Sequence, residues 1–349
     1  MSFDLRIRRF ELELDRPFET ADGTITSRRG FLVRAERDGV IGVGEATPLP
    51  GWTESFGDCK RALEAAVDAA PEGSNAALEA ADETAAARHG VSLAIADLYA
   101  TRAARPLYQY LGDGSRTARV PVNATIGDDE PAETAAAAAA AVDRGFRCCK
   151  LKVGRRRVSA DVERVERVRE AVGPSVELRV DANGAWTYDE ALEAVEALAD
   201  HDVSIVEQPL PGGALEGHAE LRGYGPKIAL DEGLLEHGVD AITTAQAADV
   251  LVLKPMALGG LDVARAVVAW TEELGLETLV TTTIDGVVAR TAALHLAAAI
   301  PDVPACGLAT RDLLATDLGD DPVVFEKGAA VVPQAKGLGI GDVWNGGAR

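Results

Sequence analysis

The chain has 349 residues, 47% of them hydrophobic, which is enough for a large core and more than one domain. Its 56 acidic and 35 basic residues give a net charge of −21, which argues against nucleic acid and anionic membranes as partners, because both need a basic surface. Four cysteines without a paired spacing and an N-terminus without a signal-peptide core predict a cytoplasmic protein with reduced thiols. The acidic excess indicates a solvated surface suited to a salt-rich, halophilic cytoplasm.

The N-terminal part of the chain predicts a small α+β domain. Residues 1–47 show near-alternation of apolar and polar side chains, with a turn at Asp38-Gly39, which is typical of antiparallel strands. Residues 55–112 instead have helical spacing and alanine-rich stretches. We therefore place an α+β domain at residues 1–118.

Two loops of this domain are candidates for contact with a ligand. Residues 18–29 are expected to form a loop that closes over the site, where Arg28 and Arg29 either meet a carboxylate or remain surface charges. A second loop follows the strand that ends near Glu45 and contains Trp52. The site that these loops would cover must come from the rest of the chain.

From residue 119 onward, strand and helix patterns alternate. Eight short apolar runs are strand candidates, at 120–126, 148–153, 177–181, 203–207, 227–231, 249–254, 277–283 and 305–308. Charged residues near their ends recur every 23–29 residues, close to the length of one βα unit in a barrel of about 200–250 residues. This pattern predicts an α/β fold with a TIM-like barrel over residues 119–310, while residues 311–349 fold back onto the first domain.

A doubly wound open sheet is the alternative fold for the alternating region. It is disfavoured because no glycine-rich phosphate fingerprint follows the first strand.

Charged residues stand at the C-terminal ends of consecutive predicted strands, where barrel active sites are built. They are Lys150 and Lys152, Asp181, Glu207, Asp231 and Lys254. Because side chains alternate along a strand, Lys150 and Lys152 should share a face. Each residue alone is ordinarily a helix cap or a surface charge, but their joint spacing favours one site.

The carboxylates predict a metal centre. Asp181, Glu207 and Asp231, with no Cys or His nearby, form a hard oxygen site that favours Mg²⁺, with Mn²⁺ as a substitute. Such a metal can bind a small-molecule carboxylate and stabilise the charge left when a proton is removed beside it. A lysine base then needs a lowered pKa, and Lys150 would provide this for Lys152.

The motifs resemble the enolase superfamily and, within it, the muconate-lactonizing subgroup. The matching stretches are Lys150-Leu151-Lys152, Asp181-Ala182-Asn183, Glu207-Gln208-Pro209, Asp231-Glu232 and Leu253-Lys254-Pro255, and the likeness covers essentially the whole chain. The resemblance implies a (β/α)7β barrel with a capping domain made from both termini. It also implies Mg²⁺ bound by Asp181, Glu207 and Asp231, with Lys152 and Lys254 on opposite faces of the substrate. Asn183 and Glu232 would then lie beside the metal, although Glu232 could equally face solvent.

A finer likeness is to the o-succinylbenzoate synthases. Residues 42–55 look like the capping loop of that family, and residues 281–286 and 307–310 look like its seventh and eighth strand ends. The residues then expected at the substrate are Thr282, Thr283, Gly307 and Leu308. The threonine hydroxyls could instead simply satisfy strand-end backbone groups. The implied reaction is the Mg²⁺-dependent dehydration of 2-succinyl-6-hydroxy-2,4-cyclohexadiene-1-carboxylate to 2-succinylbenzoate, a step of menaquinone biosynthesis.

Related activities are separated by particular residues. Mandelate-racemase-like enzymes use a His–Asp pair late in the barrel, and none of the five histidines here ends the sixth or seventh strand. Dipeptide epimerases typically carry Asp-x-Asp at the eighth strand, where this chain has Gly307-Leu308-Ala309. N-acylamino-acid racemization stays open, as does assembly into a homo-oligomer. A barrel that binds a carboxylate without turning it over is disfavoured, because every charged position of the motif is filled.

Overall fold

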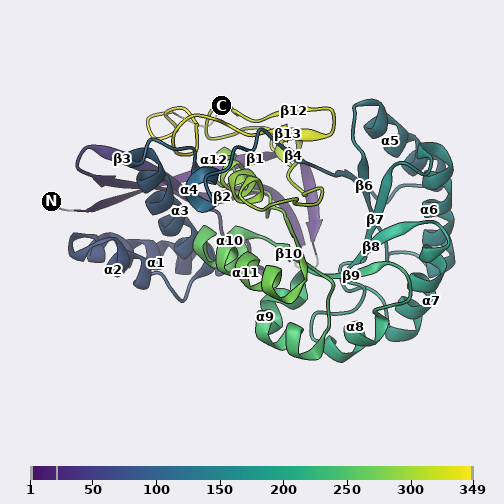
Figure 1. The fold of residues 1–349 in the computed structure, drawn as a ribbon. Helices are drawn as coiled ribbons and strands as arrows, with labels where there is room; N and C mark the ends of the chain where they lie inside the picture. Colours follow the sequence, from purple (N-terminus) through teal and green to yellow (C-terminus); the bar gives the residue numbers. More distant parts are fainter. Residues whose placement is uncertain (1–2, 21–22, 347–349) are drawn as a thin grey trace.

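A capping domain and a barrel lie side by side in the computed structural model, which describes residues 3–20 and 23–346 (Figure 1). The purple and blue N-terminal elements form the capping domain, the teal and green elements form the barrel, and the yellow C-terminal segment runs back along the capping domain.

A long β-hairpin opens the chain. Strands β1 (Asp4–Thr20), β2 (Gly23–Arg37) and β3 (Val40–Ala46) form an antiparallel sheet. Asp38 and Gly39 turn the chain between β2 and β3 with φ of 55° and 75°, as a two-residue hairpin turn requires.

The loop expected at residues 18–29 is instead part of this hairpin. The β1–β2 pairing continues to Thr20 opposite Gly23, after a register irregularity between Glu13 and Phe18. Residues 21–22, within the expected loop, lie outside the described residues. The prediction of a loop was wrong because ladder hydrogen bonds come from the backbone, so polar side chains do not prevent pairing.

Close packing between β3 and helix α3 (Ala85–Arg102) explains the glycines of this strand. A Cβ at Gly42 would collide with the backbone of Ala94, and a Cβ at Gly44 would collide with the backbone of Gly90. Glycine therefore allows β3 to lie directly on the helix. The other helical elements of the domain are α1 (Phe56–Ala69), η1 (Ala70–Glu72), α2 (Ser74–Glu79) and α4 (Leu107–Leu111).

The barrel contains a curled parallel sheet with strands in sequence order. The strands are β5 (Ala124–Ile126), β6 (Cys148–Lys152), β7 (Glu177–Asp181), β8 (Val203–Glu207), β9 (Lys227–Leu230), β10 (Val250–Leu253) and β11 (Glu277–Val280). The helices outside it are α5 (Pro131–Asp143), α6 (Val158–Val172), α7 (Tyr188–Ala199), α8 (Leu215–Leu221), α9 (Glu232–Ala245), α10 (Pro255–Leu258), α11 (Leu261–Leu274) and α12 (Val287–Ala298).

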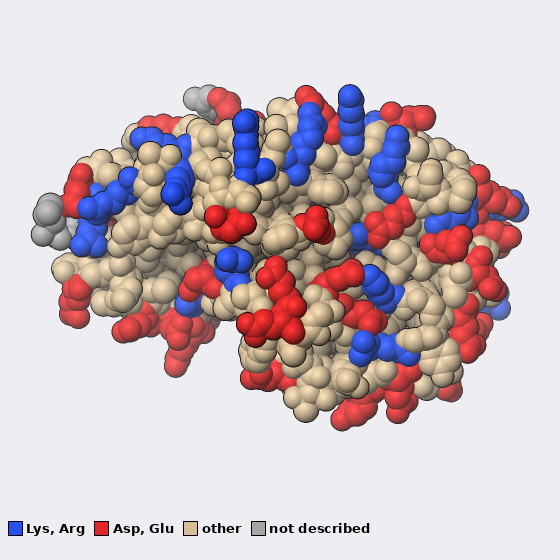
Figure 2. All heavy atoms as spheres, viewed as in Figure 1, with Lys and Arg blue, Asp and Glu red and all other residues tan. Residues whose placement is uncertain are grey.

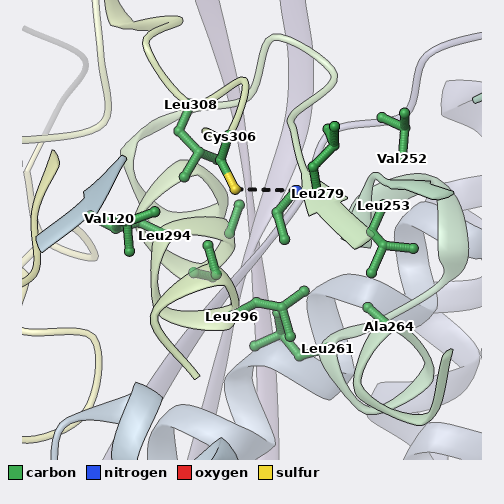
Figure 3. Close-up of a cluster of buried hydrophobic side chains, with 14 of the residues drawn as sticks. Val120, Val252, Leu253, Leu261, Ala264, Leu279, Leu294, Leu296, Cys306 and Leu308 are labelled. Atoms are coloured by element: carbon green, nitrogen blue, oxygen red, sulfur yellow. Dashed lines mark hydrogen bonds between the residues drawn. The ribbon is translucent and has the colours of Figure 1, made fainter. Parts of the chain in front are cut away.

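The predicted eighth strand, residues 305–308, closes the barrel through single bridges rather than as a continuous strand. Cys306 bridges Val122 on one side, and Gly307 bridges Thr281 on the other, both in parallel. Cys306 and Leu308 point into an apolar cluster with Leu294, and the Cys306 thiol accepts a hydrogen bond from the Val280 amide at 3.4 Å (Figure 3). The closed topology confirms the predicted barrel class.

The strand predicted over residues 120–126 is divided. β4 (Arg119–Pro121) pairs with β13 (Ala329–Val331), which also pairs with β12 (Val324–Glu326), so β4 belongs to a small sheet outside the barrel. Residues 119–121 pair with β13, whereas Val122 bridges Cys306 and residues 124–126 pair with β6, so the predicted strand is divided between two sheets.

The C-terminal segment contacts the capping domain at several points. Leu314 bridges Leu14 of β1, the Arg8 guanidinium donates to the Val343 carbonyl at 2.8 Å, and Asp97 of α3 accepts from the Leu338 amide at 2.7 Å. Both ends of the chain thus build the capping body, as the resemblance implies.

The molecular surface is mainly acidic over the outer helices. Figure 2 shows Asp and Glu gathered along the right and lower edges of this face, whereas Lys and Arg are concentrated along the upper edge. Among the described residues, no helix is long and apolar enough to cross a membrane.

Candidate active site

The strand register brings the predicted charged residues together at one end of the barrel. Lys152 pairs with Asp181 across β6 and β7, and Asp181 pairs with Glu207 across β7 and β8. Asp231 follows the last residue of β9, and Lys254 follows the last residue of β10. The parallel arrangement therefore places all of these side chains at the carboxyl ends of their strands.

Lys150 and Lys152 share a face, as the alternation along β6 predicts. Lys150 Nζ lies 3.1 Å from an Asp181 oxygen and 2.9 Å from a Glu207 oxygen. Lys152 Nζ lies 2.7 Å from an oxygen of Asp181 and 2.7 Å from the amide oxygen of Asn183. Lys150 is mostly covered, with 13% of its side chain exposed, whereas 38% of the Lys152 side chain is exposed, so Lys152 is the one open to a ligand.

Lys254 is held between the barrel and the capping domain. Its Nζ lies 2.5 Å from an Asp231 oxygen and 3.3 Å from the centroid of the Trp52 ring. An ammonium at that distance from an indole face is a cation–π contact. Trp52, predicted from the sequence as a capping-loop residue, thus reaches the lysine of the sixth barrel strand.

Burial and neighbouring lysines shift the carboxyl pKa values in different directions. Burial alone would raise the pKa of Asp181, but the ammonium groups of Lys150 and Lys152 hold that pKa well below its usual range. Burial, reinforced by the charge of Asp181, raises the pKa of Glu207 to about 7. Burial also raises the pKa of Asp231, against the opposing effect of Lys254. A cation bound beside these carboxyl groups would favour their ionised forms and so lower all three pKa values.

Lys150 keeps its charge beside Lys152. Burial alone would lower the pKa of Lys150, but the carboxylates of Asp181 and Glu207 outweigh it and raise that pKa.

The residues fit a hard divalent cation in chemistry and in charge. Asp181, Glu207 and Asp231 are 1–4% exposed, and one oxygen of Glu232 is buried without a hydrogen-bond partner among the described residues. The other Glu232 oxygen accepts from the Asn183 amide at 3.2 Å. The four carboxyl groups outnumber the three lysines of the cluster, and their oxygens are the ligands that a hard divalent cation prefers.

The carboxylates are not drawn into a preformed cage. Within residues 3–20 and 23–346, no three Asp, Glu, His or Cys side chains are arranged closely enough to hold a metal. The lysines instead bridge them, so binding of a cation would require the ammonium groups to give up some of these contacts.

The seventh and eighth strand ends use most of their hydroxyls internally. Thr282 Oγ1 lies 3.1 Å from the Thr310 hydroxyl, and the Thr283 hydroxyl donates to Asp285 at 2.6 Å. Leu308 is 2% exposed and belongs to the apolar core. A Cβ at Gly307 would meet the Thr281 side chain. These contacts favour the alternative in which the threonine hydroxyls satisfy local groups rather than a ligand.

The two capping arginines are not placed to bind a substrate carboxylate, which was one of the two alternatives that the sequence left open. Arg28 is buried, and its guanidinium donates to the carbonyls of Ile284, Pro48 and Thr47, so it has no free fork for a substrate carboxylate. Burial lowers its pKa. Arg29 is exposed and lies over the Phe56 ring, 5.2 Å from its centroid.

The sequence analysis did not single out Glu45 and Asp285, whose carboxyl groups lie at the turn between β11 and α12. Glu45 is fully buried, although it lies within the apolar, glycine-rich strand β3, whose sequence offers no obvious partner. An acidic residue in such a stretch is the signal that could have identified it, because a buried carboxylate must be paired or hydrogen-bonded.

The structure combines a parallel barrel with a capping domain and places lysines and carboxylates at consecutive strand ends, which is the arrangement of a barrel enzyme. Residues 133–341 match the family model described as enolase C-terminal domain-like. Residues 3–112 match the N-terminal domain of mandelate racemase / muconate lactonizing enzyme. The chain therefore belongs to the enolase superfamily, whose members bind Mg²⁺.

Relatives within the superfamily differ in activity. The chain is 32% identical over 354 residues to the hydrophobic dipeptide epimerase of Enterococcus faecalis, covering 96% of this chain and 98% of the relative. It is 40% identical over 211 residues to the o-succinylbenzoate synthase of Thermobifida fusca, covering 59% and 64% of the two chains. A substrate-bound structure of the L-Ala-D/L-Glu epimerase from Bacillus subtilis matches with a TM-score of 0.89 at 28% identity, over all of both chains.

Proposed function

We propose that this enzyme is an o-succinylbenzoate synthase, a lyase that dehydrates 2-succinyl-6-hydroxy-2,4-cyclohexadiene-1-carboxylate. The observation that carries the proposal is the eighth-strand end, where Gly307, Leu308 and Ala309 offer no carboxylate to a substrate ammonium. An epimerase that binds the free amino group of a dipeptide needs such a partner, because a buried ammonium must be paired. The match to the Thermobifida fusca synthase supports the same choice.

The residues at the ends of β7, β8 and β9 would hold the metal. Asp181, Glu207 and Asp231 would be the ligands, and bound Mg²⁺ would supply positive charge that stabilises the negative charge left when the proton beside the substrate carboxylate is removed. Asn183 and Glu232 hydrogen-bond to one another beside these ligands and would fix their orientation.

Lys152 would carry both proton transfers. Its nitrogen removes the proton from the ring carbon that bears the carboxylate, and the electron pair of that C–H bond passes into the ring. The resulting ammonium then donates the proton to the departing hydroxyl on the same face, so the C–O bond breaks and water leaves. Asp181 and Asn183 hold Lys152 Nζ from two sides, which limits where the proton can be exchanged.

Lys254 would remain an ammonium over the opposite face. Asp231 and Trp52 fix its nitrogen, and no proton transfer to it is needed when one base serves both steps. Its charge would stabilise the anion that forms in the ring.

Racemization of N-acylamino acids, or epimerization of dipeptides, is the second candidate. It is favoured by the end-to-end match to the Enterococcus faecalis epimerase and by the presence of a lysine on each of two strand ends. Such a reaction needs both lysines to exchange protons with one carbon, which is a different requirement from dehydration.

Turnover of the cyclohexadiene substrate tests the proposal directly. The purified protein is incubated with it and Mg²⁺ at high salt, and loss of the diene absorbance is followed with and without EDTA. We expect Mg²⁺-dependent formation of 2-succinylbenzoate and none with Lys152→Ala. A folded, Mg²⁺-loaded protein that leaves the diene intact, but exchanges the α-proton of N-succinyl amino acids or dipeptides in D₂O, would establish the second candidate instead.

A further inference from the structure

We propose that Arg28 and Glu45 are positioning residues, which clamp the turn after β11 from the capping domain and thereby fix one wall of the substrate site. The proposal deepens the proposed function, because it assigns to these residues the placement of the substrate rather than any contact with it.

The clamped turn has an unfavourable backbone. Ile284 has φ of 63°, a left-handed conformation that a β-branched residue rarely adopts without external support. The turn also bonds within itself, since Asp285 accepts from the Thr283 amide at 3.2 Å and from its hydroxyl at 2.6 Å. Such a conformation persists only where surrounding contacts determine it.

Arg28 supplies the first of these contacts. Its Nε donates to the Ile284 carbonyl at 3.1 Å, while its two terminal nitrogens donate to the carbonyls of Pro48 at 3.2 Å and Thr47 at 2.8 Å. One buried guanidinium thus ties the strained turn of the barrel to the capping loop that leads to Trp52. The planar fork of arginine suits this task, because it holds three carbonyls in fixed directions.

Glu45 supplies the second contact, at the start of α12. Its two oxygens accept from the backbone amides of Gly286 at 2.7 Å and Ala289 at 2.9 Å, and the Thr47 hydroxyl donates to it at 2.6 Å. Gly286 is the N-cap of α12 and has no side chain with which to satisfy these amides. A carboxylate at a helix N-terminus is favourable in charge as well as in hydrogen bonding.

The two segments joined by Arg28 flank Lys254. On one side, the Thr281 amide donates to the Leu253 carbonyl at 2.9 Å, so the turn begins beside the strand that carries the lysine. On the other side, the ring of Trp52 covers the lysine nitrogen. Displacement of the clamp would therefore move two of the neighbours of Lys254 while leaving Asp231 and the other metal ligands, at the ends of β7 to β9, in place.

Four variants test the clamp. Arg28→Met removes the guanidinium, Arg28→Lys keeps one charged donor, and Glu45→Gln removes the carboxylate charge. Arg8→Met is the matched control, because Arg8 lies in the same hairpin and donates to two carbonyls of the C-terminal segment, away from the site. Hydrogen exchange of the peptide covering residues 281–290 is measured together with KM, kcat and the Mg²⁺ dependence of turnover.

With Arg28→Met we expect amide exchange in residues 281–290 to rise about tenfold, and KM for the cyclohexadiene to rise about tenfold with a smaller change in kcat. The Mg²⁺ dependence should stay that of the wild type, Arg28→Lys should recover part of the loss, and Arg8→Met should change none of these values. Should Arg28→Met fail to fold, Arg28→Lys and Glu45→Gln carry the same test.

The proposal is overturned if exchange in this peptide does not change, or if it rises while KM stays within twofold of the wild type. If the wild type leaves the diene intact but Arg28→Met still loosens residues 281–290 and weakens whichever carboxylate substrate is turned over, the proposed function fails and the clamp stands.

Discussion

The ammonium nitrogen of Lys254 lies 3.3 Å from the centroid of the Trp52 ring, so a residue of the capping domain completes the surroundings of a barrel lysine. The aromatic face and the Asp231 carboxylate hold the same nitrogen. The barrel alone would leave one side of this lysine open to solvent.

Replacement of Trp52 by leucine should lower kcat/KM by about 2- to 30-fold, because a cation–π contact of this kind is worth about 0.5–2 kcal/mol. Trp52→Phe keeps an aromatic face and should retain most of the activity. Steady-state kinetics on the two variants decide this, and equal losses for leucine and phenylalanine would show that only the size of the side chain matters.

Lys254→Ala should slow dehydration by about 100-fold without abolishing it, since the lysine acts only through its charge. Lys152→Ala should abolish dehydration, because the base is lost. The measurement is product formation under single-turnover conditions. Complete loss of turnover in both variants would point to a reaction in which each lysine transfers a proton.

Mg²⁺ should raise the Tm of the wild type, since a ligand that binds the folded state at 100 times its Kd adds about 2.7 kcal/mol of stability. Glu207→Ala should not respond, because it lacks one of the three ligands. Glu193→Ala, an exposed change on α7, is the control and should respond as the wild type does. Thermal unfolding at fixed ionic strength separates this effect from general screening by salt.

Arg164→Met should lower the free energy of unfolding by about 3–5 kcal/mol, because it leaves Asp161 buried without its ion-pair partner. The Arg164 guanidinium also donates to the carbonyls of Lys152 and Gly127, each at 3.0 Å, so it supports the strand end that carries the proposed base. Arg167→Met on the same helix removes only an exposed pair with Glu170 and should change stability by less than about 0.5 kcal/mol. Urea unfolding of both variants provides the comparison.

The pH dependence of stability should contain a contribution from Glu45. Burial, reinforced by the charge of Asp285, raises the pKa of Glu45 to about 7, above its value in the unfolded chain. The folded state therefore binds the proton more tightly, and the stability from this group is lost as the pH rises from about 4.5 to 7.

The difference in Tm between the wild type and Glu45→Gln should accordingly become less favourable to the wild type between pH 5 and pH 8. A difference that stays constant over this range would mean that Glu45 is already ionised at the lower pH.

The parts of the site that could be predicted from sequence are those set by the period of the barrel. The spacing of Lys152, Asp181 and Glu207 matches successive βα units, and parallel pairing then brings these residues into register. Strand ends are well predicted by such a period, because each unit repeats the same local geometry.

Other features depend on contacts between distant parts of the chain. The bond from Arg28 to the Ile284 carbonyl spans 256 positions, so nothing near Arg28 shows whether it meets a ligand or the backbone. The strand predicted over residues 120–126 is likewise divided at Pro121 because β4 pairs with β13, which lies about two hundred residues further along the chain. Periodicity describes one element at a time and cannot show which distant segment will supply its partners.

The start of α12 is capped from both ends of the chain, because Glu45 accepts from the Gly286 amide and Asp317 accepts from the Val287 amide at 2.8 Å. On the ribosome, the first of these partners is made long before the helix and the second only after it. The last barrel helix should therefore reach its final position only when the C-terminal segment has emerged, which makes the assembly of this wall a late event in the synthesis of the protein.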